Sequence, residues 1–198
     1  MKDELTSLIE SKIETGKNLS QIKLLNEIYL RFKFNPINFV ETGCIRDLNT
    51  KFSDGWGTLS WLLWAKKTKS RIYSVDVNDN NLNAAKKILK RSPYINYIYS
   101  DSVEYLENLP ENFKIDVLFL DSFDFDHGDF DIQEASSNHQ LKEIKACEKN
   151  LNLNSLILID DIFDKKTFFG KGSKSIPYLL EKKWKIINYQ DKQILLSK

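Results

Sequence analysis

The hydrophobic and polar positions of the chain change their spacing several times after residue 38. Short apolar runs, the pattern of buried strands, occur at 38–42, 71–76, 95–99, 115–120 and 155–160. Apolar residues at helical spacing lie between them, near 56–67, 81–91, 102–108 and 134–149. Buried strands that alternate with helices are typical of repeated βα units and a mostly parallel sheet. The pattern predicts an α/β fold with a Rossmann-like, doubly wound sheet and helices on both faces.

The C-terminal segment has a different pattern. After a predicted helix near 173–182, two apolar runs cover 184–189 and 193–196, and only Gln190-Asp191-Lys192 separates them. Because this connection is too short for a parallel crossover, the two runs should form an antiparallel hairpin. The sheet should therefore have seven strands. A terminal hairpin argues against a dinucleotide-binding domain, which continues with further crossovers into a second half.

The first 33 residues show helical spacing without a strand pattern. Two groups of apolar residues, separated by a break at Gly16, recur at helical intervals: Leu5, Leu8, Ile9 and Ile13, then Ile22, Leu25, Ile28 and Tyr29. We therefore describe the chain as one domain, with a helical extension at 1–33 and a Rossmann-like core at 38–198. Short amphipathic helices are marginal alone, so their apolar faces should pack on the sheet domain or on a second copy in a homodimer. We expect them near the carboxyl ends of the strands, where they would help to close a substrate site.

Composition narrows the class of protein. With 198 residues, 41% of them hydrophobic, the chain is long enough for one compact domain. Its 29 basic and 28 acidic residues nearly cancel, so charge gives no reason to expect a nucleic-acid partner. Cys44 and Cys147 lie in different predicted elements, which favours a reducing compartment over a disulfide framework. No apolar run approaches the roughly 18 residues of a membrane span. We therefore expect a cytoplasmic location and no membrane partner.

The ends of the first two strands carry a ligand-binding pattern. Gly43 follows the first strand, and a missing Cβ lets the backbone approach a ligand. Gly55-Trp56-Gly57-Thr58 opens a helix, whose free N–H groups suit a carboxylate. Asp76 ends the second strand, where a carboxylate can accept hydrogen bonds from ribose hydroxyls. A plain turn at Gly43 and a strand-end cap at Asp76 remain the alternative, but that interpretation does not predict the two features together.

Acidic residues follow the fourth and fifth strands. Asp121 ends the fourth strand, and Asp160 and Asp161 end the fifth. The carboxyl ends of neighbouring parallel strands meet at the ligand-binding edge of such a sheet. Three carboxylates at one edge repel one another unless a cation lies between them, and oxygen ligands favour Mg²⁺. The alternative is that Asp121 is an ordinary polar edge residue and that the Asp160-Asp161 pair caps its loop.

The order of these strand-end motifs resembles the class I S-adenosylmethionine (SAM)-dependent methyltransferases. More narrowly, it is similar to the metal-dependent O-methyltransferases of the catechol and macrocin types. The resemblance covers about 38–161, through motifs that share a place at a strand end: Glu41-Thr42-Gly43, Asp54-Gly55-Trp56-Gly57-Thr58, Ser74-Val75-Asp76-Val77-Asn78, Ser100-Asp101-Ser102, Leu118-Phe119-Leu120-Asp121 and Leu158-Ile159-Asp160-Asp161. The chain departs from the family at 45–53, which is inserted in the glycine-rich turn.

The resemblance implies a set of site residues. SAM would be bound by residues at the first three strand ends, namely Glu41, Thr42, Gly43, Gly55, Gly57, Thr58, Asp76, Asp101 and Ser102. Asp101 and Ser102 would meet the adenine, although both types are also favoured as ordinary helix N-caps. A Mg²⁺ or similar ion, held by Asp121, Asp160 and Asp161, would chelate vicinal hydroxyls of the substrate.

The segment after the fourth strand, 121–131, is acidic and aromatic, and we expect it to face the substrate. His127 in this loop and Asp121 are the candidate catalytic residues, because either could take a proton from a hydroxyl. His139, in the next predicted helix, could lie behind the metal ligands, beside the metal or at the surface. Catechol enzymes have a lysine three residues after the first metal-binding Asp, whereas this chain has Asp124, so the general base stays open.

Three functions remain. The leading hypothesis is SAM-dependent, metal-assisted O-methylation of a small hydroxylated acceptor, which would be the partner molecule. A metal-independent methyltransferase, in which the aspartates bind the substrate directly, is the second. The third is a SAM- or nucleotide-binding module without catalysis, favoured by the missing lysine and the interrupted glycine turn. A hydride-transferring dehydrogenase fits less well, since the dinucleotide fingerprint is incomplete.

Overall fold

The computed structural model describes residues 3–47 and 56–198. Its strands are β1 (Asn38–Thr42), β2 (Arg71–Asp76), β3 (Ile95–Tyr99), β4 (Ile115–Leu120), β5 (Leu151–Ile159), β6 (Lys185–Gln190) and β7 (Gln193–Ser197). Its α-helices are α1 (Glu4–Thr15), α2 (Leu19–Phe32), α3 (Gly57–Thr68), α4 (Asp79–Leu89), α5 (Ser102–Glu107), α6 (Phe130–Cys147) and α7 (Ser175–Glu181).

The strands form one seven-stranded sheet in the order β3-β2-β1-β4-β5-β7-β6. The pairs among β1 to β5 are parallel, and β7 runs antiparallel to both β5 and β6. The predicted Rossmann-like sheet with its terminal antiparallel hairpin is confirmed. β2 and β3 are added on one side of β1, and β4 is added on its other side, so the strand order reverses between β1 and β4. The carboxyl ends of these two strands open a crevice at this point.

Two predicted elements begin earlier than expected. The strand predicted at 155 begins at Leu151, because leucine and asparagine alternate over 151–154 and these residues are partly or fully exposed, so they form no continuous apolar run. The helix predicted at 134 begins at Phe130, where the Asp129 side chain accepts hydrogen bonds from two backbone N–H groups of the first turn. A side-chain cap of this kind satisfies donors that have no partner inside the helix.

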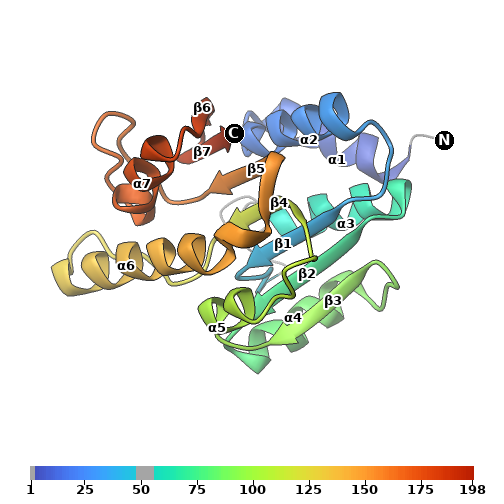
Figure 1. Ribbon diagram of the computed structural model, residues 1–198. Helices are drawn as coiled ribbons and strands as arrows, with labels where there is room; N and C mark the ends of the chain where they lie inside the picture. Colours follow the sequence, from blue (N-terminus) through green and yellow to red (C-terminus); the bar gives the residue numbers. More distant parts are fainter. Residues whose placement is uncertain (1–2, 48–55) are drawn as a thin grey trace.

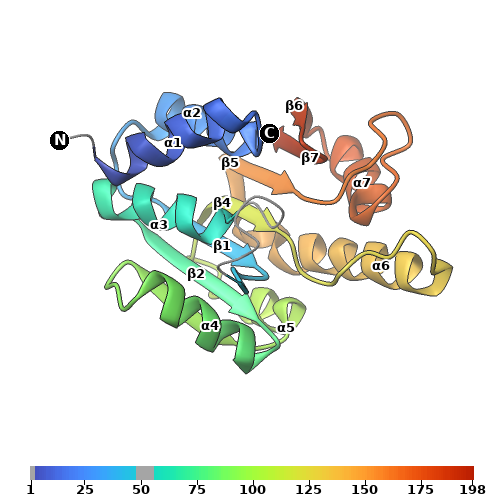
Figure 2. The ribbon, with the colours of Figure 1, turned by 180° about the vertical axis from the view of Figure 1, so that it is seen from behind.

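Alternate side chains of the central strands pack on opposite sides of the sheet. Phe39 and Phe119 belong to the core under α1 to α4, whereas Val40 and Leu118 belong to the core under α5 to α7. Views from opposite sides show α5 and α6 on one side and α3 and α4 on the other (Figures 1 and 2). The predicted placing of helices on both faces is therefore confirmed.

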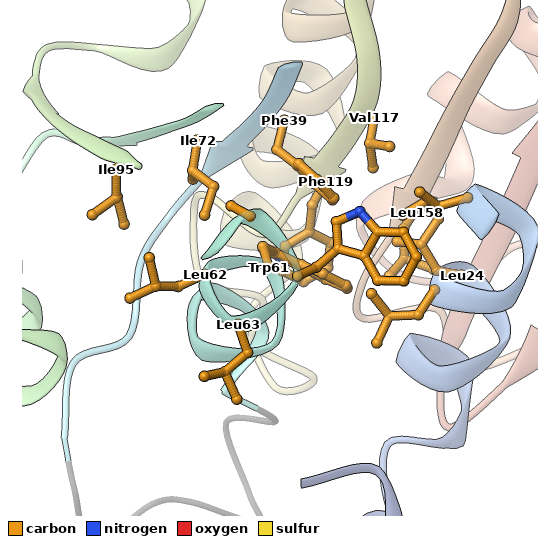
Figure 3. Packing of buried hydrophobic residues seen from close by; sticks show 14 of the residues in the cluster. Leu24, Phe39, Trp61, Leu62, Leu63, Ile72, Ile95, Val117, Phe119 and Leu158 are labelled. Carbon is orange, nitrogen blue, oxygen red and sulfur yellow. The ribbon is translucent and has the colours of Figure 1, made fainter. Parts of the chain in front are cut away.

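Trp61 of α3 lies at the centre of the first core (Figure 3). Its fully buried indole stacks on Phe39, with ring centroids 5.9 Å apart, and meets the Phe119 ring edge-on at 5.7 Å. Leu24 of α2 packs beside it. Aromatic pairs of this geometry add to the free energy gained from burial. The packing fixes α3 on β1 and β4, the two strands that flank the crevice.

The N-terminal helices cover part of one face of the sheet. α1 packs on α3, while α2 packs against β5, β6 and β7. Ser20, near the start of α2, donates its backbone N–H to Asp191 at 3.1 Å and its hydroxyl to Gln193. These contacts bring α2 close to the carboxyl end of β5, as expected. Closure of a substrate site is not seen in this part of the chain, because no residue of 3–33 lines the cleft described below.

None of the helices among residues 3–47 and 56–198 combines the length and the apolar character that crossing a membrane requires.

Candidate functional site

A cleft of about 500 Å³ opens at the carboxyl edge of the sheet. Ligand pockets commonly have volumes of roughly 300–1,000 Å³. Its walls come from the segments after β1, β2, β3 and β4 and from the start of α3. The cleft residues among the predicted site residues are Glu41, Gly43, Gly57, Thr58, Asp76, Asp101, Ser102, Asp121 and His139. Gly55 falls outside the described residues, as do positions 48–53 of the insertion, and Thr42 is buried beside the cleft.

Gly43 allows the turn after β1 to pass close to the end of β4. Its φ of +83° lies in the left-handed region, and a Cβ there would come within 2.4 Å of the Asp121 carbonyl oxygen. Glycine adopts this conformation without the steric cost that other residues meet. The position therefore requires glycine for two reasons, its backbone angle and the space available. This close approach shapes the floor of the cleft.

Glu41 lies buried beneath this turn. Its two carboxyl oxygens accept hydrogen bonds from Thr58 Oγ1 at 3.0 Å and Ser74 Oγ at 2.8 Å. Thr58 Oγ1 in turn accepts from the Ile45 backbone N–H at 3.0 Å. Burial raises the pKa of Glu41 to about 8, so the carboxyl is mostly neutral at pH 7. Glu41 thus ties β1, β2 and the first turn of α3 together rather than offering a charge to a ligand.

Asp76 presents an ordered carboxylate to the cleft. Its Oδ1 accepts from the Asn78 backbone N–H at 2.8 Å, and both of its oxygens lie 3.3 Å from Asn81 Nδ2. The Cys44 thiol lies 3.3 Å from Oδ2. These donors are all neutral, so they orient the carboxylate and leave its charge unbalanced by any of them. Such a group can still accept hydrogen bonds from vicinal hydroxyls.

The corner after β3 contains a hydrogen-bonded network. Asp101 caps α5 by accepting from the backbone N–H groups of Val103 and Glu104, as the helix-cap alternative predicts. Ser102 Oγ lies 2.9 Å from His139 Nε2. Burial alone would lower the pKa of His139, but the neighbouring Glu143 carboxylate outweighs burial and raises it. His139 also lines the cleft, next to Ser102.

Glu143 anchors this corner from below. The glutamate is fully buried on α6, and its Oε1 accepts a 2.7 Å hydrogen bond from Ser122 Oγ. The same oxygen lies 3.6 Å from His139 Nε2. One buried carboxylate thus links the segment after β4 to the His139–Ser102 pair. This network was not anticipated from the sequence, because Glu143 reads there as one more charge on an amphipathic helix.

Lys171 lies between the aspartates of the acidic edge. Its Nζ is 3.1 Å from Asp121 Oδ1 and 2.9 Å from Asp161 Oδ2, and the residue is only 1% exposed. Burial by itself lowers the pKa of an ammonium, but the Asp121 and Asp161 carboxylates raise the pKa of Lys171 well above its usual value. The lysine therefore stays charged. It bridges the ends of β4 and β5.

Asp160 is bound differently from its neighbours. Its Oδ1 accepts from the Asp161 backbone N–H at 2.7 Å, and its Oδ2 accepts from Gln193 Nε2 at 2.8 Å. Burial, followed by the charges of Asp121 and Asp161, raises the pKa of Asp160 to about 8. Burial also raises the pKa of Asp121, while Lys171 opposes that rise. The edge thus holds two carboxylates paired with an ammonium and a third that stays protonated at neutral pH.

These side chains do not fit the expected divalent ion. The three aspartates do meet at one edge, but the Lys171 ammonium already lies against the oxygens that would bind the metal. A divalent ion about 4 Å from that ammonium would be repelled by roughly 8 kcal/mol even at an effective dielectric constant of about 20. Within residues 3–47 and 56–198, no group of three or more His, Cys, Asp or Glu side chains is arranged to hold a metal ion.

His127 lies away from the cleft, in a cluster of aromatic rings. Its ring centroid is 4.1 Å from that of Phe163, and the rings of Phe125 and Phe169 complete the cluster. Two loops, one after β4 and one after β5, pack together in this way. The expected catalytic role of His127 is not supported, because the described lining of the cleft includes His139 but not His127.

Comparison with known proteins extends the fold assignment. No protein-family model matches the chain, and no curated protein matches it in sequence. A Staphylococcus aureus protein assigned as a caffeoyl-CoA O-methyltransferase superposes with a TM-score of 0.63 at 14% identity, over 100% of this chain and 93% of that one. The N-methyltransferase NodS from Bradyrhizobium japonicum WM9 gives 0.53 at 14% identity, over 90% of this chain and 92% of that one.

A third similar structure contains both ligands that the sequence suggested. MycE, a methyltransferase of the mycinamycin biosynthetic pathway in complex with Mg and SAH (S-adenosylhomocysteine), gives a TM-score of 0.58 at 13% identity. The match covers 87% of this chain but only 47% of MycE. At such identities the likeness concerns the fold. The chain has the fold of the class I SAM-dependent methyltransferases.

Proposed function

We propose that the protein binds SAM in the cleft and transfers the methyl group to a small hydroxylated acceptor. The observation that carries the proposal is the course of the cleft, whose lining includes the Gly43 turn, Asp76, the β3 corner and Asp121. A nucleoside end and a reactive end can therefore occupy one continuous space. The fold shared with known methyltransferases supports the same conclusion.

The nucleoside part is assigned to the β1–β3 half of the cleft. Asp76 would accept hydrogen bonds from the ribose hydroxyls, since neutral donors already orient its carboxylate. Ser102 and His139 would meet the base at the β3 corner. The N–H groups at the start of α3, at Gly57 and Thr58, would meet the carboxylate of the methionine part.

The acceptor is assigned to the Asp121 end. SAM supplies a methyl group that is already activated as a sulfonium, so the chain has to provide position and a destination for one proton. Asp121 lines the cleft, its side chain remains 34% exposed, and Lys171 orients it through Oδ1. We assign Asp121 to accept the proton of the acceptor hydroxyl while that oxygen bonds to the methyl carbon, the sulfur–methyl bond of SAM breaks and S-adenosylhomocysteine leaves. Asp121 then releases the proton to water.

The binding module without catalysis is the second candidate. Asp124 stands where catechol enzymes have a lysine, and Arg46 pairs with it at 3.2 Å, which occupies both side chains at the mouth of the cleft. Such a protein would bind SAM and S-adenosylhomocysteine but would transfer no methyl group. Incubation with SAM labelled in its methyl group, across a panel of small phenols, sugars and hydroxy acids, separates the two candidates.

Titration calorimetry with S-adenosylhomocysteine tests cofactor binding itself. We expect Asp76→Ala to weaken binding at least tenfold, because two charge-assisted hydrogen bonds to the ribose would be lost, each contributing about 1.5–3 kcal/mol. Asp79→Ala is the matched control, since Asp79 is exposed in the first turn of α4 and lies outside the cleft lining. Equal affinities of the wild type and Asp76→Ala would contradict the assignment.

A further inference from the structure

The segment that carries Lys171 holds this side chain inside the protein. After β5 the chain forms a short excursion, closed by an antiparallel bridge between Ile162 and Gly170. The Lys171 backbone N–H then donates to the Asp161 carbonyl oxygen at 3.1 Å, and the Lys171 ammonium returns to the Asp161 carboxylate. Main chain and side chain of one residue thus both bind Asp161.

Two glycines flank the lysine, and both lie where a side chain would collide. A Cβ at Gly170, whose φ is +131°, would lie 1.9 Å from the Asp161 carbonyl oxygen. A Cβ at Gly172 would lie 2.5 Å from the Cδ1 atoms of both Ile162 and Ile176. The backbone must therefore pass very close to the end of β5 on both sides of Lys171. This close packing buries the lysine.

The Lys171 ammonium balances negative charge at the acidic edge of the sheet. Asp121 follows β4 and Asp161 follows β5, and each contributes an oxygen to Lys171 Nζ. Repulsion between carboxylates at adjacent strand ends is the physical reason to expect a cation between them. Lys171 is a cation at that position, supplied by the chain.

We propose that the Lys171 ammonium takes the place of the acceptor-side divalent ion, so that this protein neutralises its acidic edge without a metal. Lys171 is then a positioning residue, because it is buried beneath Asp121 and is absent from the described cleft lining. It holds Asp121 Oδ1 and leaves the rest of that carboxyl toward the cleft. The positioning of Asp121 for an acceptor rests on the proposed function, whereas the replacement of the metal does not.

Thermal unfolding of the full chain at about pH 7.5 tests the replacement of the divalent ion by Lys171 without an activity assay. We expect the wild-type Tm to be the same in excess EDTA, Mg²⁺ or Mn²⁺. Lys171→Met should lower the Tm by roughly 10 °C, because it leaves the half-buried Asp121 and Asp161 carboxylates without their cation. Lys165→Met, at an exposed lysine in the same excursion, is the matched control and should shift it by less than about 2 °C.

Manganese binding, followed by electron paramagnetic resonance, provides a readout that a merely structural lysine would not change. The wild type should show no specific Mn²⁺ site. Lys171→Ala opens space between Asp121, Asp160 and Asp161, and we expect it to gain a one-to-one Mn²⁺ site and to recover part of the lost Tm when Mn²⁺ is added.

A double variant covers the case in which Lys171→Ala does not fold. Lys171→Met combined with Asp161→Asn removes one positive and one negative charge, so it should regain at least half of the Tm lost by Lys171→Met alone. One-to-one Mn²⁺ binding by the wild type that Asp121→Asn abolishes would overturn the proposal. A wild-type Tm in Lys171→Met would overturn it too.

S-adenosylhomocysteine binding is measured on the same wild-type sample. Absence of that binding would contradict the proposed function and would leave the metal results intact. Binding together with a wild-type Mn²⁺ site would support the proposed function and contradict the role of Lys171.

Discussion

The two halves of the carboxyl edge of the sheet hold their carboxylates in opposite ways. In the β1–β3 half, Asp76 is oriented by an amide side chain, a backbone N–H and a thiol, all of them neutral. In the β4–β5 half, Asp121 and Asp161 are paired with the buried Lys171 ammonium. A carboxylate with neutral donors keeps its charge available to a ligand, whereas a carboxylate paired with an internal cation has much of its charge balanced already.

The difference in pairing corresponds to a difference in task. The first half is suited to bind hydroxyls through a fixed anion. In the second half, the Lys171 ammonium lies between Asp121 and Asp161 and balances part of their charge. Each half also contains a glycine that lets two backbone segments meet, Gly43 near Asp121 and Gly170 near Asp161. The following predictions test how far the two halves differ.

The largest effect is expected at Gly170. Alanine at this position would combine an unfavourable φ with a Cβ 1.9 Å from the Asp161 carbonyl oxygen, so the segment that carries Lys171 would have to move. We expect a loss of more than about 3 kcal/mol in the free energy of unfolding. Gly16→Ala is the matched control, because Gly16 also has a positive φ of 64° but has nothing within 4 Å of the added Cβ.

Urea unfolding at pH 7 measures both variants. Gly16→Ala should cost only about 1 kcal/mol, the backbone strain alone. If both substitutions lower the free energy of unfolding by the same amount, the close packing of Gly170 beside Lys171 contributes nothing to stability beyond the backbone angle.

The next effect compares one aspartate from each half. Asp161→Asn removes a negative charge from beside a buried ammonium, and we expect a loss of about 3 kcal/mol in unfolding free energy. Asp76→Asn removes a charge that is balanced by no cation among its hydrogen-bond partners, and we expect about 1 kcal/mol. Asparagine tolerates the left-handed backbone of Asp161, whose φ is 55°, so strain does not confuse the comparison.

Denaturant titrations of the two variants, each with and without S-adenosylhomocysteine, complete this test. Asp161→Asn should keep its ligand-induced stabilisation, while Asp76→Asn should lose most of it. If Asp161→Asn lost the ligand-induced stabilisation and Asp76→Asn kept it, the ligand-binding carboxylate would lie in the β4–β5 half, which would contradict the assignment of Asp76.

The two halves also differ in how much of them the sequence reveals. Asp76 and Gly43 lie at strand ends, so the apolar runs that predict the strands also predict where these two residues lie. The start of α3 follows from the helical spacing of the next segment. The strand positions themselves were predictable for the same reason, since buried parallel strands are nearly continuous apolar runs. Local pattern was sufficient for the fold and for the places of Gly43 and Asp76, but not for the contacts of Glu143 with His139 and Ser122.

Lys171 could not be found in this way. It pairs with Asp121 across 50 positions of sequence, and its Gly170-Lys171-Gly172 setting is usually a signal for an exposed loop. A lysine is seldom fully buried, so burial is the last expectation for it. The sequence therefore indicated that the aspartates need a cation but not that the chain supplies one. The packing of His127 on Phe163 could not be predicted either, because the two residues are 36 positions apart and belong to different loops.

The last prediction, and the one that compares the two halves most directly, is a pH dependence. Burial raises the pKa of Glu41 in one half and of Asp160 in the other to about 8. Each group is protonated in the folded chain but ionised in the unfolded chain between its ordinary pKa and about 8, so the folded state binds more protons there. Stability should therefore be greatest below the ordinary pKa and should fall as the pH rises toward 8, by up to about 1.4 kcal/mol per pH unit for each group.

Glu41→Gln keeps a neutral side chain of similar shape and should remove one of the two contributions. We expect urea unfolding between pH 5 and 7, at steps of about half a unit, to give a slope in this variant that is shallower than that of the wild type by up to about 1.4 kcal/mol per pH unit. Glu14→Gln, at an exposed glutamate of α1, should leave the slope unchanged. A wild-type slope in Glu41→Gln would show that Glu41 is ionised in the folded chain.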